Sequence, residues 1–178
     1  MQLRLPNPDK LFLVGPMGSG KTAIGKELAR QLGLDFLDAD QEIERRTGAD
    51  IPLIFEKEGE AGFRRREREI IQELTQRDCL VLATGGGAVL DPANREALGS
   101  RGFVIYLKAT VGAQAARTGR NRNRPLLQSG DPTAKLEQLF AERAPLYEGL
   151  ARLTVDTDSG QVRRIAERIV EALGKPST

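Results

Sequence analysis

Short apolar segments alternate with longer amphipathic segments along most of the chain. Each apolar segment is bounded by glycine or polar residues, which is typical of short buried strands. The expected strands cover residues 10–14, 35–38, 79–83, 103–107 and 153–155. Because buried strands that alternate with helices favour parallel pairing, the pattern predicts a three-layer α/β fold with a parallel sheet.

The segments between these strands have the spacing of helices. Ile24, Leu28 and Leu32 recur at every fourth position, and the apolar residues within 162–173 fall on a single helical face. The other expected helices cover residues 41–47, 51–57, 60–77, 92–98, 111–117 and 132–146. By contrast, residues 119–130 are polar and rich in arginine and asparagine, which predicts a mobile loop.

Composition narrows the possible functions. The chain has 178 residues, of which 39% are hydrophobic, so one domain with a substantial core is expected. A net charge of +2 and an aromatic content of 4% argue against nucleic acid as a partner. The absence of histidine excludes histidine general bases, histidine metal sites and Ser-His-Asp triads.

The same composition gives an expectation about the compartment. A single cysteine, Cys79, excludes an internal disulfide and suits a reducing cytoplasm. No apolar run approaches the roughly 20 residues of a membrane helix, so no membrane partner is expected. Residues 1–10 contain two prolines and lack the apolar segment of a signal peptide.

A phosphate-binding motif follows the first expected strand. Residues 15–22, GPMGSGKT, match G-x-x-x-x-G-K-[ST]. The glycines allow backbone N–H groups to surround an anion, and the following helix adds its positive dipole end. Lys21 is then expected to reach the β and γ phosphates, and the Thr22 hydroxyl to bind Mg²⁺. An ordinary glycine-rich turn before a helix is the alternative.

Two acids, Asp38 and Asp40, lie at the end of the second expected strand. Residues i and i+2 of an extended chain point to the same side, so both carboxylates are placed to face the phosphates. One of them is suited to hold Mg²⁺ through water, and the other to accept a proton from an attacking hydroxyl or to position it. The alternative for Asp40 is a helix-capping role.

Several arginines and a glycine triplet complete the candidate chemistry. Arg64 follows an apolar residue near the start of a charged helix, and Arg143 has apolar helical neighbours, so both are candidates to point inward and bind a carboxylate. Residues 85–87 allow a ligand to approach the backbone closely. A solvated helix face and a flexible turn are the respective alternatives. The candidates to close over the phosphates as a lid are Arg117, Arg120, Arg122 and Arg124.

The chain resembles the bacterial shikimate kinases over nearly its whole length. The resemblance is carried, in this order, by GPMGSGKTAIGKELA, FLDAD, IFEKEGEAGFRRRE, ATGGGAV, RNRPLL and RAPLY. It implies a nucleoside-monophosphate-kinase-like P-loop fold with five parallel strands in the order 2-3-1-4-5. It also implies a single domain over residues 1–178, with a substrate-binding region at about 38–66 and a lid at about 118–131.

The resemblance further implies a reaction and its partners. The reaction is Mg²⁺-dependent transfer of the γ-phosphoryl group of ATP to the 3-hydroxyl of shikimate, in chorismate and aromatic amino-acid biosynthesis. The expected enzyme is a cytoplasmic monomer. Its partners are ATP and shikimate, without nucleic acid or membrane.

The resemblance also assigns roles to individual residues. The implied catalytic residues are Lys21, Asp40 and Arg124. The implied ATP-binding residues are Gly15, Gly18, Ser19, Gly20, Lys21, Thr22, Ala23, Arg117 and Arg124. The implied shikimate-binding residues are Asp40, Arg64, Gly85, Gly86, Gly87 and Arg143. Thr22 and Asp38 match the metal ligands, and Glu67 matches an acid that orients the first substrate arginine.

Small departures and two alternative functions remain. Ala23 replaces a common Ser or Thr, which is not expected to change the chemistry, and residues 156–161 form an adenine loop without assigned contacts. Another small P-loop kinase, for gluconate or a nucleoside monophosphate, leaves the combined acid, arginine and glycine set unexplained. A nucleotide-dependent switch that hydrolyses ATP without an acceptor is the second alternative.

Overall fold

The computed structural model describes residues 9–118 and 131–174, which contain a five-stranded parallel sheet. Its strands are β1 (Lys10–Val14), β2 (Asp35–Asp38), β3 (Leu80–Ala83), β4 (Phe103–Lys108) and β5 (Leu153–Asp156). The strands lie in the order β2-β3-β1-β4-β5, and every neighbouring pair is parallel. The predicted parallel α/β fold and its strand order are therefore confirmed.

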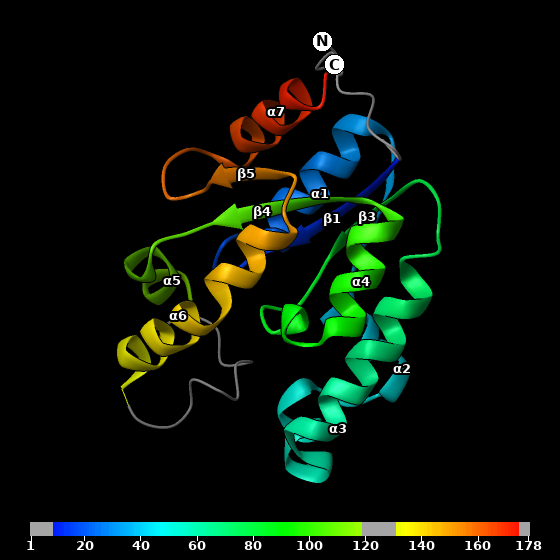
Figure 1. Cartoon of the computed structure of the whole chain (residues 1–178), viewed down its shortest axis with the longest axis vertical. Coiled ribbons are helices and arrows are strands. Elements are labelled where there is room, and N and C mark those ends of the chain that lie inside the picture. The colour runs from blue at the N-terminus through cyan, green and yellow to red at the C-terminus, as the bar shows by residue number, and fades with distance from the viewer. Residues whose placement is uncertain (1–8, 119–130, 175–178) are drawn as a thin grey trace.

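Helices cover both faces of this sheet (Figure 1). They are α1 (Lys21–Leu32), α2 (Ala39–Thr47), α3 (Ile51–Leu74), α4 (Pro92–Arg101), α5 (Val111–Thr118), α6 (Pro132–Leu150) and α7 (Val162–Ala172), with a 3₁₀ turn at Ala88–Leu90. Side chains of β1 alternate between the two faces. Leu11 and Leu13 belong to the core under α1 and α7, whereas Phe12 and Val14 belong to the core formed with α2, α3, α4 and α6. This alternation explains why the strand is apolar throughout.

Four helices differ by two or more residues from their predicted bounds, among them α4, which ends at Arg101 rather than 98. The two helices expected at 51–57 and 60–77 form the single element α3, which is kinked at Gly59 where φ is 73°. Helix α2 begins at Ala39 rather than 41, because the Asp38 carboxylate accepts a hydrogen bond from the Gln41 N–H and caps it. Helix α6 continues to Leu150, which packs against the core; this tertiary contact leaves no signal in local spacing.

The parallel sheet gathers the candidate chemistry at one edge. The phosphate-binding loop follows β1, Asp38 ends β2, and residues 85–87 follow β3. Asp38 is in register with Ala83, which in turn is in register with Leu13. The loops that follow these three neighbouring strands therefore emerge side by side, as expected for a ligand site in an open α/β sheet.

Within the described part of the chain, no helix combines the length and the apolar character that crossing a membrane requires.

Candidate active site

The loop between β1 and α1 has the backbone of an anion site. Gly15, Gly18 and Gly20 adopt φ values of 150°, 75° and 90°, which side chains rarely allow. The Lys21 ammonium group donates to the carbonyl oxygens of Gly15 at 2.7 Å and Pro16 at 2.8 Å. Its positive charge is thus held over the loop at the start of α1, where the helix dipole also favours an anion.

Thr22 and Asp38 place two side-chain oxygens next to each other beside this loop. The Thr22 hydroxyl donates to Asp38 Oδ2 at 2.6 Å, while Asp38 Oδ1 accepts from the Gln41 N–H at 3.1 Å. Mg²⁺ prefers such oxygen ligands and usually takes only one or two from the protein, the rest coming from phosphates and water. Residues 9–118 and 131–174 contain no cluster of three or more acidic, cysteine or histidine side chains suited to a metal. Two protein oxygens are a number that fits a Mg²⁺ ion whose other ligands come from phosphates and water.

Asp40 reaches the same region from the first turn of α2 rather than from extended chain. Its capping alternative is wrong, because the capping carboxylate is that of Asp38. A methyl group at Gly85 would lie 2.9 Å from Asp40 Oδ1 and 2.9 Å from Glu67 Oε2. Glycine at position 85 therefore leaves room for two carboxylates to approach the turn that follows β3.

Glu67 is a buried acid with an unusual protonation equilibrium. Its side chain is 1% exposed, and one oxygen accepts from Arg64 Nη1 at 3.0 Å. Burial raises the pKa of Glu67 to about 7; Arg64 opposes this rise and Asp40 adds to it. Near neutral pH, therefore, Glu67 exchanges a proton beside the candidate base and the candidate substrate arginine.

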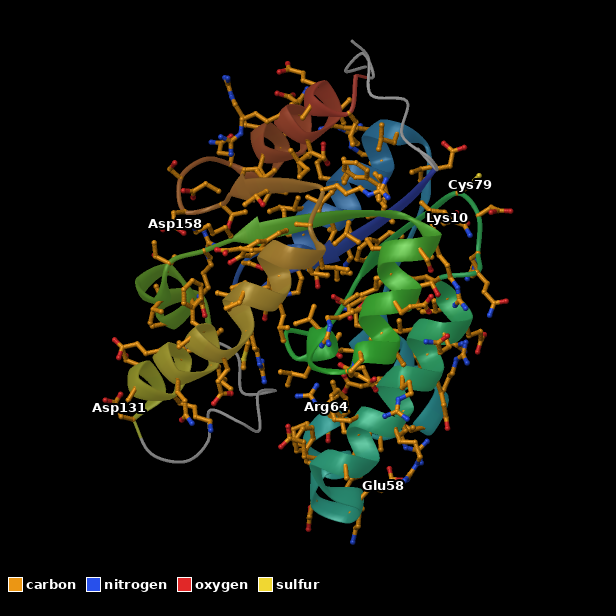
Figure 2. The ribbon with its side chains drawn as sticks, in the orientation of Figure 1. Lys10, Glu58, Arg64, Cys79, Asp131 and Asp158 are labelled. Carbon is orange, nitrogen blue, oxygen red and sulfur yellow. The ribbon has the colours of Figure 1, made fainter. Side chains whose placement is uncertain are left out.

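Arg64 points inward, as predicted, whereas its neighbours in sequence do not. Figure 2 shows its side chain leaving α3 on the side that faces α6. A Cβ atom at Gly87 would overlap the guanidinium group of Arg64, so only glycine at position 87 lets Arg64 lie this close to the turn after β3. Arg66 instead pairs with Glu58 at 2.7 Å, and Arg65 is 63% exposed. The solvated-face interpretation thus holds for Arg65 and Arg66, but not for Arg64, whose side chain is 19% exposed.

Arg143 is the second inward-pointing cation of the region, and it is more deeply buried than Arg64. It is 4% exposed, and a Cβ atom at Gly86 would lie 3.5 Å from its Nη1. Its Nε has no hydrogen-bond partner among the described residues. A buried guanidinium with an unused donor is suited to bind an anionic ligand.

The phosphate loop, the two acids and the glycine turn meet around a cavity of about 430 Å³, whose lining does not include Arg64, Glu67 or Arg143. Its lining consists of Gly18, Gly20, Lys21, Thr22, Ala23, Asp38, Asp40, Gln41, Glu44, Ile51, Thr84, Gly85 and Gly86. The predicted phosphate loop, both acids and two of the three glycines therefore share one space. Sequence reasoning missed Gln41 and Glu44, although they lie one and four residues after Asp40, a spacing that places Glu44 on the same helical face.

The remaining predicted residues lie at the margin. Arg117 donates to the carbonyl oxygens of Gly18 at 2.7 Å and Thr157 at 2.6 Å, and so links the phosphate loop to the segment after β5. Arg120, Arg122 and Arg124, with most of the expected lid at 118–131, lie outside the described residues.

Comparison with known proteins agrees with this geometry. The profile of the family described as Shikimate kinase matches residues 17–174. A shikimate kinase of Halorhodospira halophila is 58% identical over 171 residues, covering 96% of this chain and 97% of the relative. The solved shikimate kinase from Acinetobacter baumannii in complex with shikimate has a TM-score of 0.91 at 53% identity, covering 92% of each chain. That from Bacteroides thetaiotaomicron has a TM-score of 0.85 at 32% identity, covering 93% of this chain and 98% of its own.

Proposed function

The chain belongs to the shikimate kinase family, and from this premise we propose that it transfers the γ-phosphoryl group of ATP to the 3-hydroxyl of shikimate. One observation carries the proposal: the phosphate loop, Asp40 and the glycine turn line a single cavity of about 430 Å³. A phosphate donor and a small acceptor can meet there. Phosphoryl transfer depends mainly on such positioning and on neutralising charge.

On the donor side, the protein provides cationic and N–H contacts for the phosphates. Lys21 exchanges its contacts with the Gly15 and Pro16 carbonyls for the β and γ phosphates, which are stronger acceptors. Thr22 and Asp38 are proposed to hold Mg²⁺, which when bound supplies positive charge against the phosphate oxygens. The backbone from Gly18 to Ala23 surrounds the phosphates.

Arginines complete the donor side. Arg117 lies between the phosphate loop and the segment after β5, where the adenine ring is proposed to bind. Arg124, outside the described residues, is proposed to approach the transferred group from the lid.

On the acceptor side, Asp40 is proposed to accept the proton of the 3-hydroxyl or to hold that hydroxyl in line. Arg64 and Arg143 are proposed to bind the shikimate carboxylate, because both guanidinium groups adjoin the glycine turn and Arg143 Nε has an unused donor among the described residues. Residues 85–87 supply backbone contacts. An uncharged alcohol would leave the buried Arg143 Nε, which has no hydrogen-bond partner among the described residues, without an acceptor, and this favours an acidic substrate.

An assay of ADP release tests this proposal and separates it from its alternatives. Folded protein with ATP and Mg²⁺ is supplied with shikimate, with gluconate, with a nucleoside monophosphate, or with no acceptor. We expect ADP formation that depends on shikimate. Turnover with gluconate or the monophosphate instead, or turnover indifferent to any acceptor, would replace the proposal by the corresponding alternative.

Other expectations stay predictions. These are a monomer in the cytoplasm without nucleic-acid or membrane partners, and a single domain with a substrate-binding region at about 38–66 and a lid at about 118–131.

A further inference from the structure

Two tyrosines on different elements lie against each other beneath the glycine turn. Tyr106 of β4 and Tyr147 of α6 are both 0% exposed, and their ring centroids are 5.1 Å apart. Their hydroxyl groups differ in what they contact. Tyr147 donates to the Gly86 carbonyl oxygen at 2.5 Å, whereas the Tyr106 hydroxyl has no hydrogen-bond partner among the described residues.

The bond from Tyr147 completes the hydrogen bonding of the glycine turn. The Gly85 carbonyl accepts from the Ala88 N–H, and the Gly87 carbonyl accepts from the Leu90 N–H, each at 3.1 Å. These local bonds close the 3₁₀ turn at Ala88–Leu90. The central carbonyl, that of Gly86, is held instead by a side chain 61 residues away in sequence. The orientation of the Gly86 peptide therefore depends on α6.

The same phenol also lies close to the second substrate arginine. Arg143 lies one helical turn before Tyr147 on α6, and its positive charge opposes the rise that burial causes in the pKa of the phenol. Burial raises the pKa of Tyr147, so the hydroxyl keeps its proton at neutral pH and remains a donor to the Gly86 carbonyl. The Tyr147 hydroxyl and the Arg143 guanidinium thus both adjoin Gly86, since a Cβ atom there would lie 3.5 Å from Arg143 Nη1.

We propose that Tyr147 is a positioning residue for the acceptor: its hydroxyl fixes the Gly86 peptide beside the Arg143 guanidinium. This inference rests on the proposed function, since it takes Gly86 and Arg143 to be contacts of the acidic acceptor. Tyr147 does not line the 430 Å³ cavity, so it acts through these two residues. Its loss should weaken acceptor binding more than ATP binding, because the phosphate loop has its own hydrogen bonds.

Tyr147→Phe tests the proposal, with Tyr106→Phe as a matched control. Both substitutions remove one buried hydroxyl and keep the ring, but only the first removes the bond to Gly86. We expect Tyr147→Phe to raise the shikimate KM roughly ten-fold, as for the loss of one buried hydrogen bond, with an ATP KM within about two-fold of wild type. Tyr106→Phe should leave both constants within about two-fold of wild type.

Several results would overturn the inference. One is an unchanged shikimate KM in Tyr147→Phe, and another is an equal rise in both KM values. A Tyr147→Phe chain that does not fold, judged by its thermal unfolding beside Tyr106→Phe, would also overturn it by assigning the hydroxyl to fold stability. Failure of the proposed function looks different, because wild-type protein would then form no shikimate-dependent ADP.

Discussion

Glu67→Gln tests whether the buried acid beside Asp40 titrates near neutral pH. The substitution keeps the size of a side chain that is 1% exposed and removes its titrating group. Burial raises the pKa of Glu67 from 4.5 to about 7 in the folded protein, against the attraction of Arg64. Between these two pH values the folded protein therefore binds more protons than the unfolded chain, and the free energy of unfolding falls as pH rises.

The size of this effect follows from the pKa difference. A pKa raised from 4.5 to about 7 corresponds to roughly 3 kcal/mol, present below pH 4.5 and lost by the time the pH has risen through 7. Glu67→Gln lacks this contribution. The unfolding free energy of the variant minus that of wild type should therefore rise by up to about 3 kcal/mol as the pH is raised from about 5 to about 8. Losing the ion pair with Arg64 also shifts this difference by an amount that does not depend on pH, so the test is how the difference changes with pH.

Urea unfolding of both proteins across this pH range measures the difference directly. Glu60→Gln is the control, because Glu60 pairs with the same arginine at 3.4 Å but its side chain is 53% exposed. This control keeps Glu67, so its unfolding free energy should fall with rising pH as that of wild type does. A stability difference between Glu67→Gln and wild type that stays constant with pH, or that shrinks as pH rises, would refute the reasoning.

Three further substitutions test other parts of the site and fold. Gly87→Ala places a methyl group against the Arg64 guanidinium and should raise the shikimate KM about ten-fold or more in steady-state assays. Gly149→Ala is the control, because its Cβ meets no atom within 4 Å, and equal shikimate KM values in the two variants would contradict the close contact between Gly87 and Arg64. Asp38→Asn keeps an oxygen for the helix cap but loses the negative charge. The Mg²⁺ concentration that gives half the maximal rate should therefore rise about ten-fold while the urea midpoint of unfolding stays unchanged, and a wild-type Mg²⁺ dependence would remove Asp38 from the metal site. Gly59→Ala forces a side chain to adopt φ 73° and should lower the free energy of unfolding by about 1–2 kcal/mol, and equal stability in urea titration would argue against the kink.

Features that arise from local sequence were predictable. Each strand is a short apolar run, and the phosphate loop has residue types that only a tight, anion-binding backbone requires. The inward direction of Arg64 followed from its place after Phe63 near the expected start of a helix. Strand order came from the family resemblance, because apolar runs alone do not say which strands are neighbours.

Contacts between distant segments were not predictable. The sequence offered only Asp40 as a candidate helix cap, and the fold shows instead that Asp38 takes this role while Asp40 faces Gly85. Likewise, the bond from Tyr147 to Gly86 joins positions 61 residues apart, and no spacing rule relates them. Such polar contacts are decided by how helices pack on the sheet, which local periodicity does not encode.

The central claim is that the phosphoryl group of ATP reaches the 3-hydroxyl of shikimate in this cavity. Its most direct test is identification of the product by phosphorus–proton NMR after turnover of wild-type protein with ATP, Mg²⁺ and shikimate. The account predicts a phosphate monoester coupled to the proton on C3, formed in equal amount to ADP. Inorganic phosphate as the only new species, or a phosphate at another hydroxyl, would contradict it.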